Sequence, residues 1–287
     1  ALLKGTSTAT TTEEGRNATR RPTGSFGLVA ATRGAADAGD DASVWEGVEY
    51  TVGRGEGAVR LRQRRADAFV LADHAIAREN SVDNTGMVCL WPAEEVLCHY
   101  CCAHAQRFDG KRVLELGAGV GLAGFILAAT AGAAAVHLTD GNPQVVQQLE
   151  HNIGTNRDRF RATAVSAGVL HWARAPPVRE EERYEIIIAA DCTFFKDFHA
   201  ELAGTIAAYM RDSGEALLFN PPRHGTLAAF AAVAEAQAGL RAELVERYDE
   251  RVWAKHEALR SGAAADEWPA YDEDTSYPRL LRLTKKQ

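Results

Sequence analysis

The length and composition of the chain bound the class of protein it can be. Its 287 residues suffice for one large domain or two small ones, and 46% hydrophobic residues can build a buried core. The formal net charge of -7 argues against a nucleic-acid-binding protein, which would normally carry a basic excess. No apolar run is long enough to span a bilayer. From the charge we therefore expect no nucleic-acid partner, and from the lack of such a run we expect no membrane association.

The five cysteines form an odd set in apolar contexts, which indicates reduced thiols rather than a disulfide framework. This favours a cytoplasmic protein, with the nucleus as a second location, and we expect a monomer. Cys98-His-Tyr-Cys101, with His104 nearby, has the spacing of half a metal site. No second ligand pair follows, so we interpret these cysteines as buried helix residues and expect no metal.

Residues 1–43 are rich in Thr, Ala, Gly and Asp and hold few aromatic residues. Such a segment buries too little surface to fold, so we predict a disordered tail. Its basic, Thr-rich beginning leaves a targeting segment open, although no organised apolar stretch is present. Residues 44–287 should form the folded domain, with 44–82 as an N-terminal extension.

Alternating residues 48–52 and 58–62 flank a glycine-rich turn, which predicts a β-hairpin in this extension. Val59 and Leu61 would face the core, and Arg60 and Arg62 would face outward. The outward arginines are either a solvated sheet edge or a docking surface for an acidic partner. The sequence leaves both interpretations open.

From Met87 onward, strands alternate with helices, which predicts an α/β fold with a doubly wound parallel sheet. Helices are expected near residues 92–105, from 122, and at 143–156, 197–210 and 226–238. Strands are expected near residues 112–116, 135–139, 162–165, 185–190, 215–219, 242–248 and 279–284. Ligands of such sheets bind beyond the carboxyl ends of the strands, so the residue after each strand is the one to inspect.

Residues 113–124 read Val-Leu-Glu-Leu-Gly-Ala-Gly-Val-Gly-Leu-Ala-Gly, a short buried strand that turns through glycines into a helix. Gly117, Gly119 and Gly121 lack Cβ atoms, so a ligand can press against the backbone where the helix begins. The segment is therefore typical of a nucleotide-cofactor turn.

Two classes of cofactor compete for this turn. Residues 119–124 match the dinucleotide pattern GxGxxG, but the match begins two residues too late, and the expected register places Leu122 at the third glycine. Glu115 at the strand tip suits a cation, such as the amino group of S-adenosylmethionine, and is a poor neighbour for pyrophosphate. We therefore favour a methyl donor over a dinucleotide.

Polar and aromatic residues follow the other strands. Asp140 can accept hydrogen bonds from ribose hydroxyls of either cofactor, or it is a turn residue of Asp-Gly-Asn. Trp172, after the third strand, and Trp91, before its helix, could each pack against adenine or belong to the core. Asp191 ends an isoleucine-rich strand beside aromatic residues, where a carboxylate indicates a site rather than a surface.

Asn220-Pro-Pro222 resembles the start of a motif in enzymes that methylate amide or base nitrogens. That motif belongs after the fourth strand, whereas here it follows the fifth. We therefore do not assign that chemistry to it, although Pro221-Pro222-Arg223 could shape a substrate entrance.

Several motifs together carry a family resemblance that spans residues 45–287. They are Asp83-Asn-Thr-Gly86, Val88-Cys-Leu-Trp-Pro92 followed by Glu94-Glu-Val-Leu97, Leu138-Thr-Asp-Gly-Asn142, Ala190-Asp-Cys192 with its nearby aromatic residue, and Tyr277-Pro278 leading into Leu283-Thr-Lys285. On these residues the chain resembles the seven-strand S-adenosylmethionine-dependent, Rossmann-like methyltransferases that modify lysine. The segment from Asp83 to Pro92 and the C-terminal segment from Tyr277 to Lys285 resemble the members of that group that act on calmodulin.

This resemblance implies a role for each matching residue. S-adenosylmethionine, converted to S-adenosylhomocysteine, would be held by Trp91, Glu115, Gly117, Ala118, Gly119, Gly121, Asp140, Asn142, Trp172 and Ala190. Asp191 and Phe194 would be catalytic, in that Asp191 captures and aligns the lysine. Phe195, Arg60, Arg62, Arg223 and Tyr277 would contact the protein substrate, calmodulin, whose lysine would receive up to three methyl groups.

Three alternatives remain open from the sequence. The same chemistry could act on a lysine of another protein, such as an elongation factor or a chaperone. The fold could bind the donor without catalysis and serve as an interaction module. A dinucleotide oxidoreductase is disfavoured by Leu122 and by the lack of a second catalytic constellation.

Overall fold

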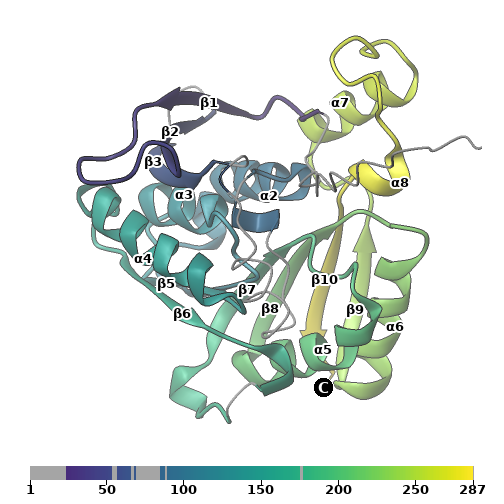
Figure 1. Cartoon of the computed structure of the whole chain (residues 1–287). Helices are drawn as coiled ribbons and strands as arrows, with labels where there is room; N and C mark the ends of the chain where they lie inside the picture. The colour runs from purple at the N-terminus through teal and green to yellow at the C-terminus, as the bar shows by residue number, and fades with distance from the viewer. Residues whose placement is uncertain are drawn as a thin grey trace, which may run out of the picture.

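The structure, a computed structural model, describes residues 24–53, 57–65, 68, 85–87, 89–174 and 177–286. Within these ranges the chain forms a three-stranded antiparallel sheet and a seven-stranded mixed sheet (Figure 1). The small sheet contains β1 (Val29–Gly34), β2 (Trp45–Val52) and β3 (Gly57–Arg64). The large sheet has the order β6-β5-β4-β7-β8-β10-β9. β10 is antiparallel to both of its neighbours, β8 and β9, and the other pairs of neighbouring strands are parallel.

The elements of the large sheet and its helices follow the predicted alternation. The strands are β4 (Arg112–Leu116), β5 (Ala135–Asp140), β6 (Ala164–Val169), β7 (Tyr184–Ala190), β8 (Met210–Asn220), β9 (Leu240–Val245) and β10 (Arg279–Lys285). The helices are α2 (Pro92–Ala103), α3 (Leu122–Thr130), α4 (Pro143–Asn156), α5 (His199–Tyr209), α6 (Thr226–Gln237), α7 (Glu250–Arg260) and α8 (Glu273–Ser276). The doubly wound seven-strand sheet with an N-terminal β extension is therefore confirmed.

Helices cover both faces of the large sheet (Figure 1). A cluster of buried hydrophobic residues lies on each face. The cluster under α2, α3, α4 and the small sheet contains alternate strand residues such as Val113 and Ile188. The cluster under α5 and α6 contains the intervening residues, such as Leu114 and Ile187. Because successive strand residues face opposite sides, an apolar run such as Glu185–Ala190 feeds both clusters, as the sequence predicted.

The predicted hairpin is present as β2 and β3, with Val59 and Leu61 both fully buried. The prediction that residues 1–43 are disordered is wrong for residues 24–43. Phe26 and Leu28 are 3% and 4% exposed, and their backbone N–H groups donate to Glu95 on α2 at 2.9 and 2.7 Å. Composition could not reveal this, because β1 itself is mostly exposed and is held by backbone pairing with β2. Residues 1–23 lie outside the described residues.

Helix α7 was not predicted, although its sequence carries a signal. Asp249 caps the helix by accepting hydrogen bonds from the N–H groups of Arg251 and Val252, both at 2.9 Å. Val252, His256 and Leu259 then recur at helical spacing and are buried. The aspartate at the end of a strand was the missed start signal.

The cysteine interpretation agrees with the structure, since Cys98 and Cys101 are fully buried on α2. Burial raises the pKa of both thiols, which keeps them protonated. In the part of the chain that the structure describes, no helix has the length and apolarity needed to cross a membrane.

Candidate functional site

The predicted glycine turn and Asp191 follow β4 and β7, which are neighbouring parallel strands. From β4 the chain passes through α3 to β5 on one side, while β7 lies on the other side. The strand order thus reverses between β4 and β7, and doubly wound sheets bind their ligands at such a reversal. The fold therefore brings the glycine turn after β4 next to Asp191 after β7.

The glycine turn has the backbone that its sequence predicted. Gly117, Gly119 and Gly121 adopt left-handed φ angles of 63°, 53° and 75°, which side chains other than glycine rarely tolerate. A Cβ atom on Gly119 would approach the carbonyl oxygen of Gly86 to 3.0 Å, and one on Gly121 would approach Leu149 to 2.5 Å. Part of the glycine requirement therefore comes from internal packing rather than from a ligand.

Glu115 lies beneath this turn and is 1% exposed. Its Oε2 accepts a hydrogen bond from the Gly124 N–H at 3.0 Å, and a Cβ atom on Gly124 would collide with that oxygen. Within the described residues its second oxygen, Oε1, has no hydrogen-bond partner. A buried carboxylate oxygen without a donor could accept a hydrogen bond from a cationic group.

A second buried carboxylate, which the sequence analysis did not single out, accompanies Glu115. Glu94 on α2 accepts a hydrogen bond from the Ala123 N–H at 2.8 Å. Burial raises the pKa of Glu94 to about 7, and burial together with the Glu94 charge raises the pKa of Glu115 well above its usual range. The pair places two buried carboxyl groups below the glycine turn, and the positively charged methionine end of S-adenosylmethionine would favour their ionised form.

Asp140 and Trp172, the residues predicted to contact ribose and adenine, both border the glycine turn. Asp140 accepts hydrogen bonds from the Gly119 N–H at 3.1 Å and the Asn142 N–H at 2.8 Å, which fixes its carboxylate beside the turn. Trp172 lies 3.7 Å from the position of a Cβ atom on Gly117, so an aromatic face borders the same turn. These residues fit a nucleoside with a cationic tail.

The remaining predicted cofactor residues differ in what they offer. Ala118 donates its N–H to the Thr139 carbonyl at 2.9 Å, and half-buried Ala190 ends β7. Trp91 is the N-cap residue of α2, and its carbonyl accepts from the Glu95 N–H. Asn142 is fully buried, and its side-chain oxygen caps α4 by accepting from the Gln144 N–H at 2.9 Å. We therefore correct the expected cofactor contact of the Asn142 side chain to a helix-capping role.

Asp191 follows β7 in a left-handed backbone conformation, with φ of 53°. Its side chain is 13% exposed, and its N–H donates to the Phe219 carbonyl on β8 at 2.9 Å. The rings of Phe194 and Phe195 lie close together, 4.0 Å between centroids, and Phe195 is 44% exposed. The predicted catalytic pair, Asp191 and Phe194, thus lies at the surface end of the β4–β7 junction.

Arg223 comes from the loop after β8 and forms a bidentate ion pair with Asp191. Its Nε donates to Oδ1 at 2.9 Å, its Nη2 donates to Oδ2, and its guanidinium lies 5.7 Å from the Phe194 ring centroid. The sequence placed Arg223 at the substrate entrance but did not predict this ion pair. The neighbouring Asn220 is fully buried and accepts a hydrogen bond from the Thr193 N–H at 3.1 Å. Asn220 therefore supports the loop after β7.

Tyr277 does not contact the site surface, contrary to the predicted substrate role. It is 2% exposed, its hydroxyl donates to the Glu246 carbonyl, and its ring stacks on His256 at 3.9 Å between centroids. The correction is physical, since a side chain buried in an aromatic cluster cannot reach a protein substrate. Its contribution is to packing.

Arg60 and Arg62 are engaged in ion pairs within the N-terminal segment. Arg60 pairs with Asp37 at 2.9 Å, and Arg62 pairs with Asp40 at 2.9 Å while lying over the Trp45 ring. The backbone of Arg60 also bonds to Asn156, the last residue of α4. Because α4 begins at the ligand-binding edge of the sheet, its end lies toward the opposite edge. These arginines are therefore set apart from Asp191 and already have acidic partners.

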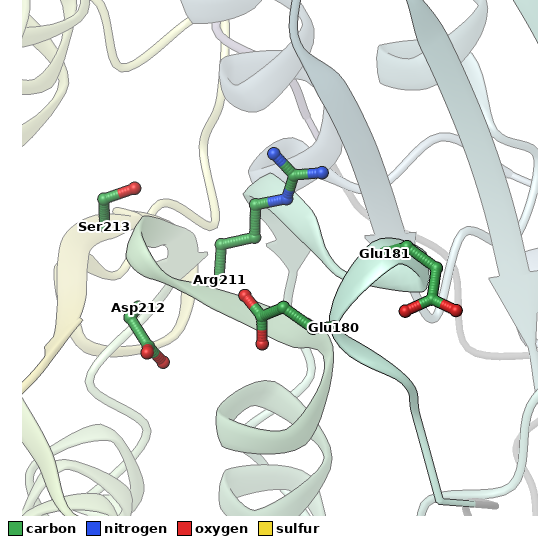
Figure 2. Close-up of a pocket in the computed structure, with 5 residues that line it drawn as sticks. All are labelled: Glu180, Glu181, Arg211, Asp212 and Ser213. Atoms are coloured by element: carbon green, nitrogen blue, oxygen red, sulfur yellow. The ribbon is translucent and has the colours of Figure 1, made fainter.

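A surface hollow of about 530 Å³ lies where β7 and β8 begin, at the edge opposite the predicted site. Figure 2 shows its lining residues, Glu180, Glu181, Arg211, Asp212 and Ser213. The charges are paired across this region, since Arg211 binds Glu185 at 2.5 Å and Lys285 binds Asp212 at 2.8 Å. The hollow holds none of the predicted site residues.

Comparisons with known proteins agree with this geometry. A family model described as lysine methyltransferase matches residues 71–235. Calmodulin-lysine N-methyltransferase of Arabidopsis thaliana is 40% identical over 289 residues, which cover 100% of this chain and 94% of that protein. Protein N-lysine methyltransferase METTL21A of Danio rerio is 33% identical over 148 residues, 51% of this chain and 66% of that protein. A solved TehB-like SAM-dependent methyltransferase from Corynebacterium glutamicum is 19% identical with a TM-score of 0.45, covering 75% of this chain and 98% of that chain.

Proposed function

Because this chain belongs to the lysine methyltransferase family, we propose that it methylates a lysine ε-amine of calmodulin. The calmodulin assignment is supported by the Arabidopsis relative, which matches over the whole chain and carries that substrate in its name. The family confirms that the protein is a methyltransferase that uses S-adenosylmethionine, as the glycine turn predicted. It also removes the dinucleotide alternative.

The observation that carries the proposal is the adjacency of two acidic strand ends. Glu115 near the end of β4 and Asp191 after β7 belong to neighbouring parallel strands, paired from Val113–Ile186 to Leu116–Ala189. One acid lies under a turn suited to the donor, and the other is partly buried after β7, close in sequence to Phe194. A donor and a protein side chain can therefore meet between the two strand ends.

The substrate amine must lose a proton before it can attack. Lysine is about 3 pKa units too basic to be neutral at pH 7, so exposing its lone pair costs about 4–5 kcal/mol. A carboxylate beside the amine favours the ammonium form, so Asp191 does not serve as the source of this deprotonation. The donor supplies a sulfonium-bound methyl group, whose positive charge favours the neutral amine.

The role of Asp191 is then capture and alignment. Its carboxylate would bind the arriving ammonium in place of Arg223, with the ring of Phe194 beside the cation. The proton leaves to water before in-line attack. Alignment of this kind can lower a barrier by several kcal/mol without acid–base chemistry.

The test is transfer of labelled methyl from S-adenosylmethionine to purified, unmethylated calmodulin, followed by mass spectrometry of the product. We expect labelling at one lysine, with up to three methyl groups, and loss of labelling with Asp191→Asn. If the protein binds the donor but leaves calmodulin unlabelled, the calmodulin assignment is wrong and the substrate is a lysine of another protein.

A further inference from the structure

The ion pair between Asp191 and Arg223 places a cation where the proposed reaction needs the substrate lysine. Both Asp191 oxygens accept hydrogen bonds from the guanidinium, which also lies near the face of Phe194. These are the two groups that would receive the lysine ammonium. The pair is largely shielded, with side chains 17% and 13% exposed.

The loop that carries Arg223 is held in a conformation that its sequence does not favour. Arg223 and His224 have left-handed φ angles of 44° and 54°, a conformation that is strained for residues with a Cβ atom. Asp274 of α8 compensates, since its carbonyl accepts from the Arg223 N–H and its carboxylate from the His224 N–H, both at 2.8 Å. The fold thus maintains the guanidinium over Asp191.

A lysine that binds Asp191 must displace the Arg223 guanidinium from the Asp191 carboxylate. The guanidinium would then lose both of its carboxylate bonds in a partly buried place, which is costly for a charge. A carboxylate on the incoming protein would restore the lost partner. The exchange replaces the single Arg223–Asp191 pair with two pairs, one between the lysine and Asp191 and one between Arg223 and the substrate carboxylate.

We propose that Arg223 is a specificity-determining residue that selects lysines flanked by acidic side chains. It occupies Asp191 until a substrate supplies both the lysine for Asp191 and a carboxylate for the guanidinium. This inference rests on the proposed function, because it assumes that Asp191 captures the lysine. The overall charge of -7 repels acidic proteins, so a preference for them requires a local cation of this kind.

The test measures binding rather than methyl transfer, so that it does not depend on turnover. Two fluorescent peptides of equal length, with one lysine flanked by Glu or by Gln, are titrated against the full chain loaded with S-adenosylhomocysteine at physiological salt. We expect the wild-type protein to bind the Glu peptide about tenfold more tightly. In Arg223→Gln the ratio should fall to about one, with tighter binding of the Gln peptide because its competitor is gone.

Arg211→Gln is the matched control, since it removes the same charge from an ion pair at the other end of β8 and should preserve the wild-type ratio. Arg223→Lys keeps the charge but not the two-pronged geometry, and its ratio should lie between the other two. If Arg223→Gln shows no thermal unfolding transition and is therefore not folded, Arg223→Lys replaces it as the test variant. An unchanged ratio in either folded Arg223 variant would overturn the proposal, as would a loss of affinity equal for both peptides, which marks a purely structural arginine.

Labelling of calmodulin separates the two proposals. If calmodulin is labelled while the peptide ratio does not depend on Arg223, the enzyme function stands and the exchange is wrong. If calmodulin is not labelled while the ratio depends on Arg223, the selection of acid-flanked lysines stands and the substrate is another acidic protein.

Discussion

The ends of β4 and β7 are neighbours in one sheet, yet they treat their carboxylates in opposite ways. Glu115 is buried beside Glu94, and one of its oxygens has no partner within the described residues. Asp191 has both oxygens satisfied by Arg223. The donor side thus holds carboxyl groups whose ionised form a cationic ligand would stabilise, whereas on the acceptor side Arg223 already neutralises the Asp191 charge. Methyl transfer requires both ligands at once. The donor meets buried carboxyl groups, whereas the substrate lysine meets a carboxylate that is already paired with an arginine.

The largest effect is expected from Asp191→Asn, which removes the acceptor charge and with it the ion pair to Arg223. Turnover should fall by at least about 100-fold, because the lysine is no longer aligned, while donor affinity changes by less than about twofold. Calorimetric donor binding and labelled-methyl transfer, measured on the same preparation, separate these quantities. If donor affinity fell as much as turnover, Asp191 would belong to the cofactor site, and the two strand ends would not have separate roles.

Glu115→Gln should affect binding of the methyl donor rather than of the substrate lysine. Loss of a charge-assisted interaction with the donor amine should weaken donor binding by about 10–100-fold. The same change removes repulsion with Glu94, so the ligand-free protein should unfold at a higher temperature. Differential scanning calorimetry with and without donor measures both effects. A lower unfolding temperature together with unchanged donor affinity would show that Glu115 is only structural.

The pH dependence of the donor side follows from the raised pKa values of Glu94 and Glu115. The folded protein holds these protons more tightly than the unfolded chain, so this contribution to stability is lost as pH rises from about 4.5 through about 7. A cationic donor favours the ionised pair, so its binding should release protons near neutral pH and strengthen by less than tenfold per pH unit.

Calorimetry in buffers of different ionisation enthalpy counts the released protons. Glu94→Gln is the control, since it leaves one carboxylate and should reduce the release. Proton uptake on donor binding would contradict this account.

The smallest effect is expected from Arg62→Gln. Arg62 is paired with Asp40 and lies over Trp45, so its removal should lower the unfolding temperature slightly and change the KM for calmodulin by less than about twofold. Steady-state kinetics at two salt concentrations test this. A raised KM with a weaker salt dependence would instead establish the hairpin as a docking surface and extend the acceptor side beyond Asp191.

The donor side could be predicted from the sequence because it is local. Glu115, Gly117 and Gly119 follow one another after a single strand, and their spacing alone defines the turn. The acceptor side could be predicted only in part. Asp191 is visible at a strand end, but its partner Arg223 lies 32 positions further along, in a loop set by Asp274. Tertiary pairing of this kind leaves no periodic signal in the sequence.

Tyr277 and β1 were misjudged for a related reason. A motif match marked Tyr277 without indicating whether the residue served packing or binding, and the aromatic cluster around it is assembled from distant segments. β1 was hidden because its residues are mostly exposed, and it is held by backbone pairing with β2 and by the hydrogen bond from the Val29 N–H to Glu95. In both cases the deciding contacts are long-range.

Adjacent residues of α2 connect the beginning of the folded chain to the donor site. Glu95 binds the backbone of Phe26 and Leu28, and Glu94 binds the backbone at the start of α3. A fragment that began at residue 44 would leave the Glu95 carboxylate buried without these donors, one residue away from Glu94. The smallest independently folding unit therefore includes residue 26, and proteolytic trimming past that point should reduce cofactor affinity as well as thermal stability.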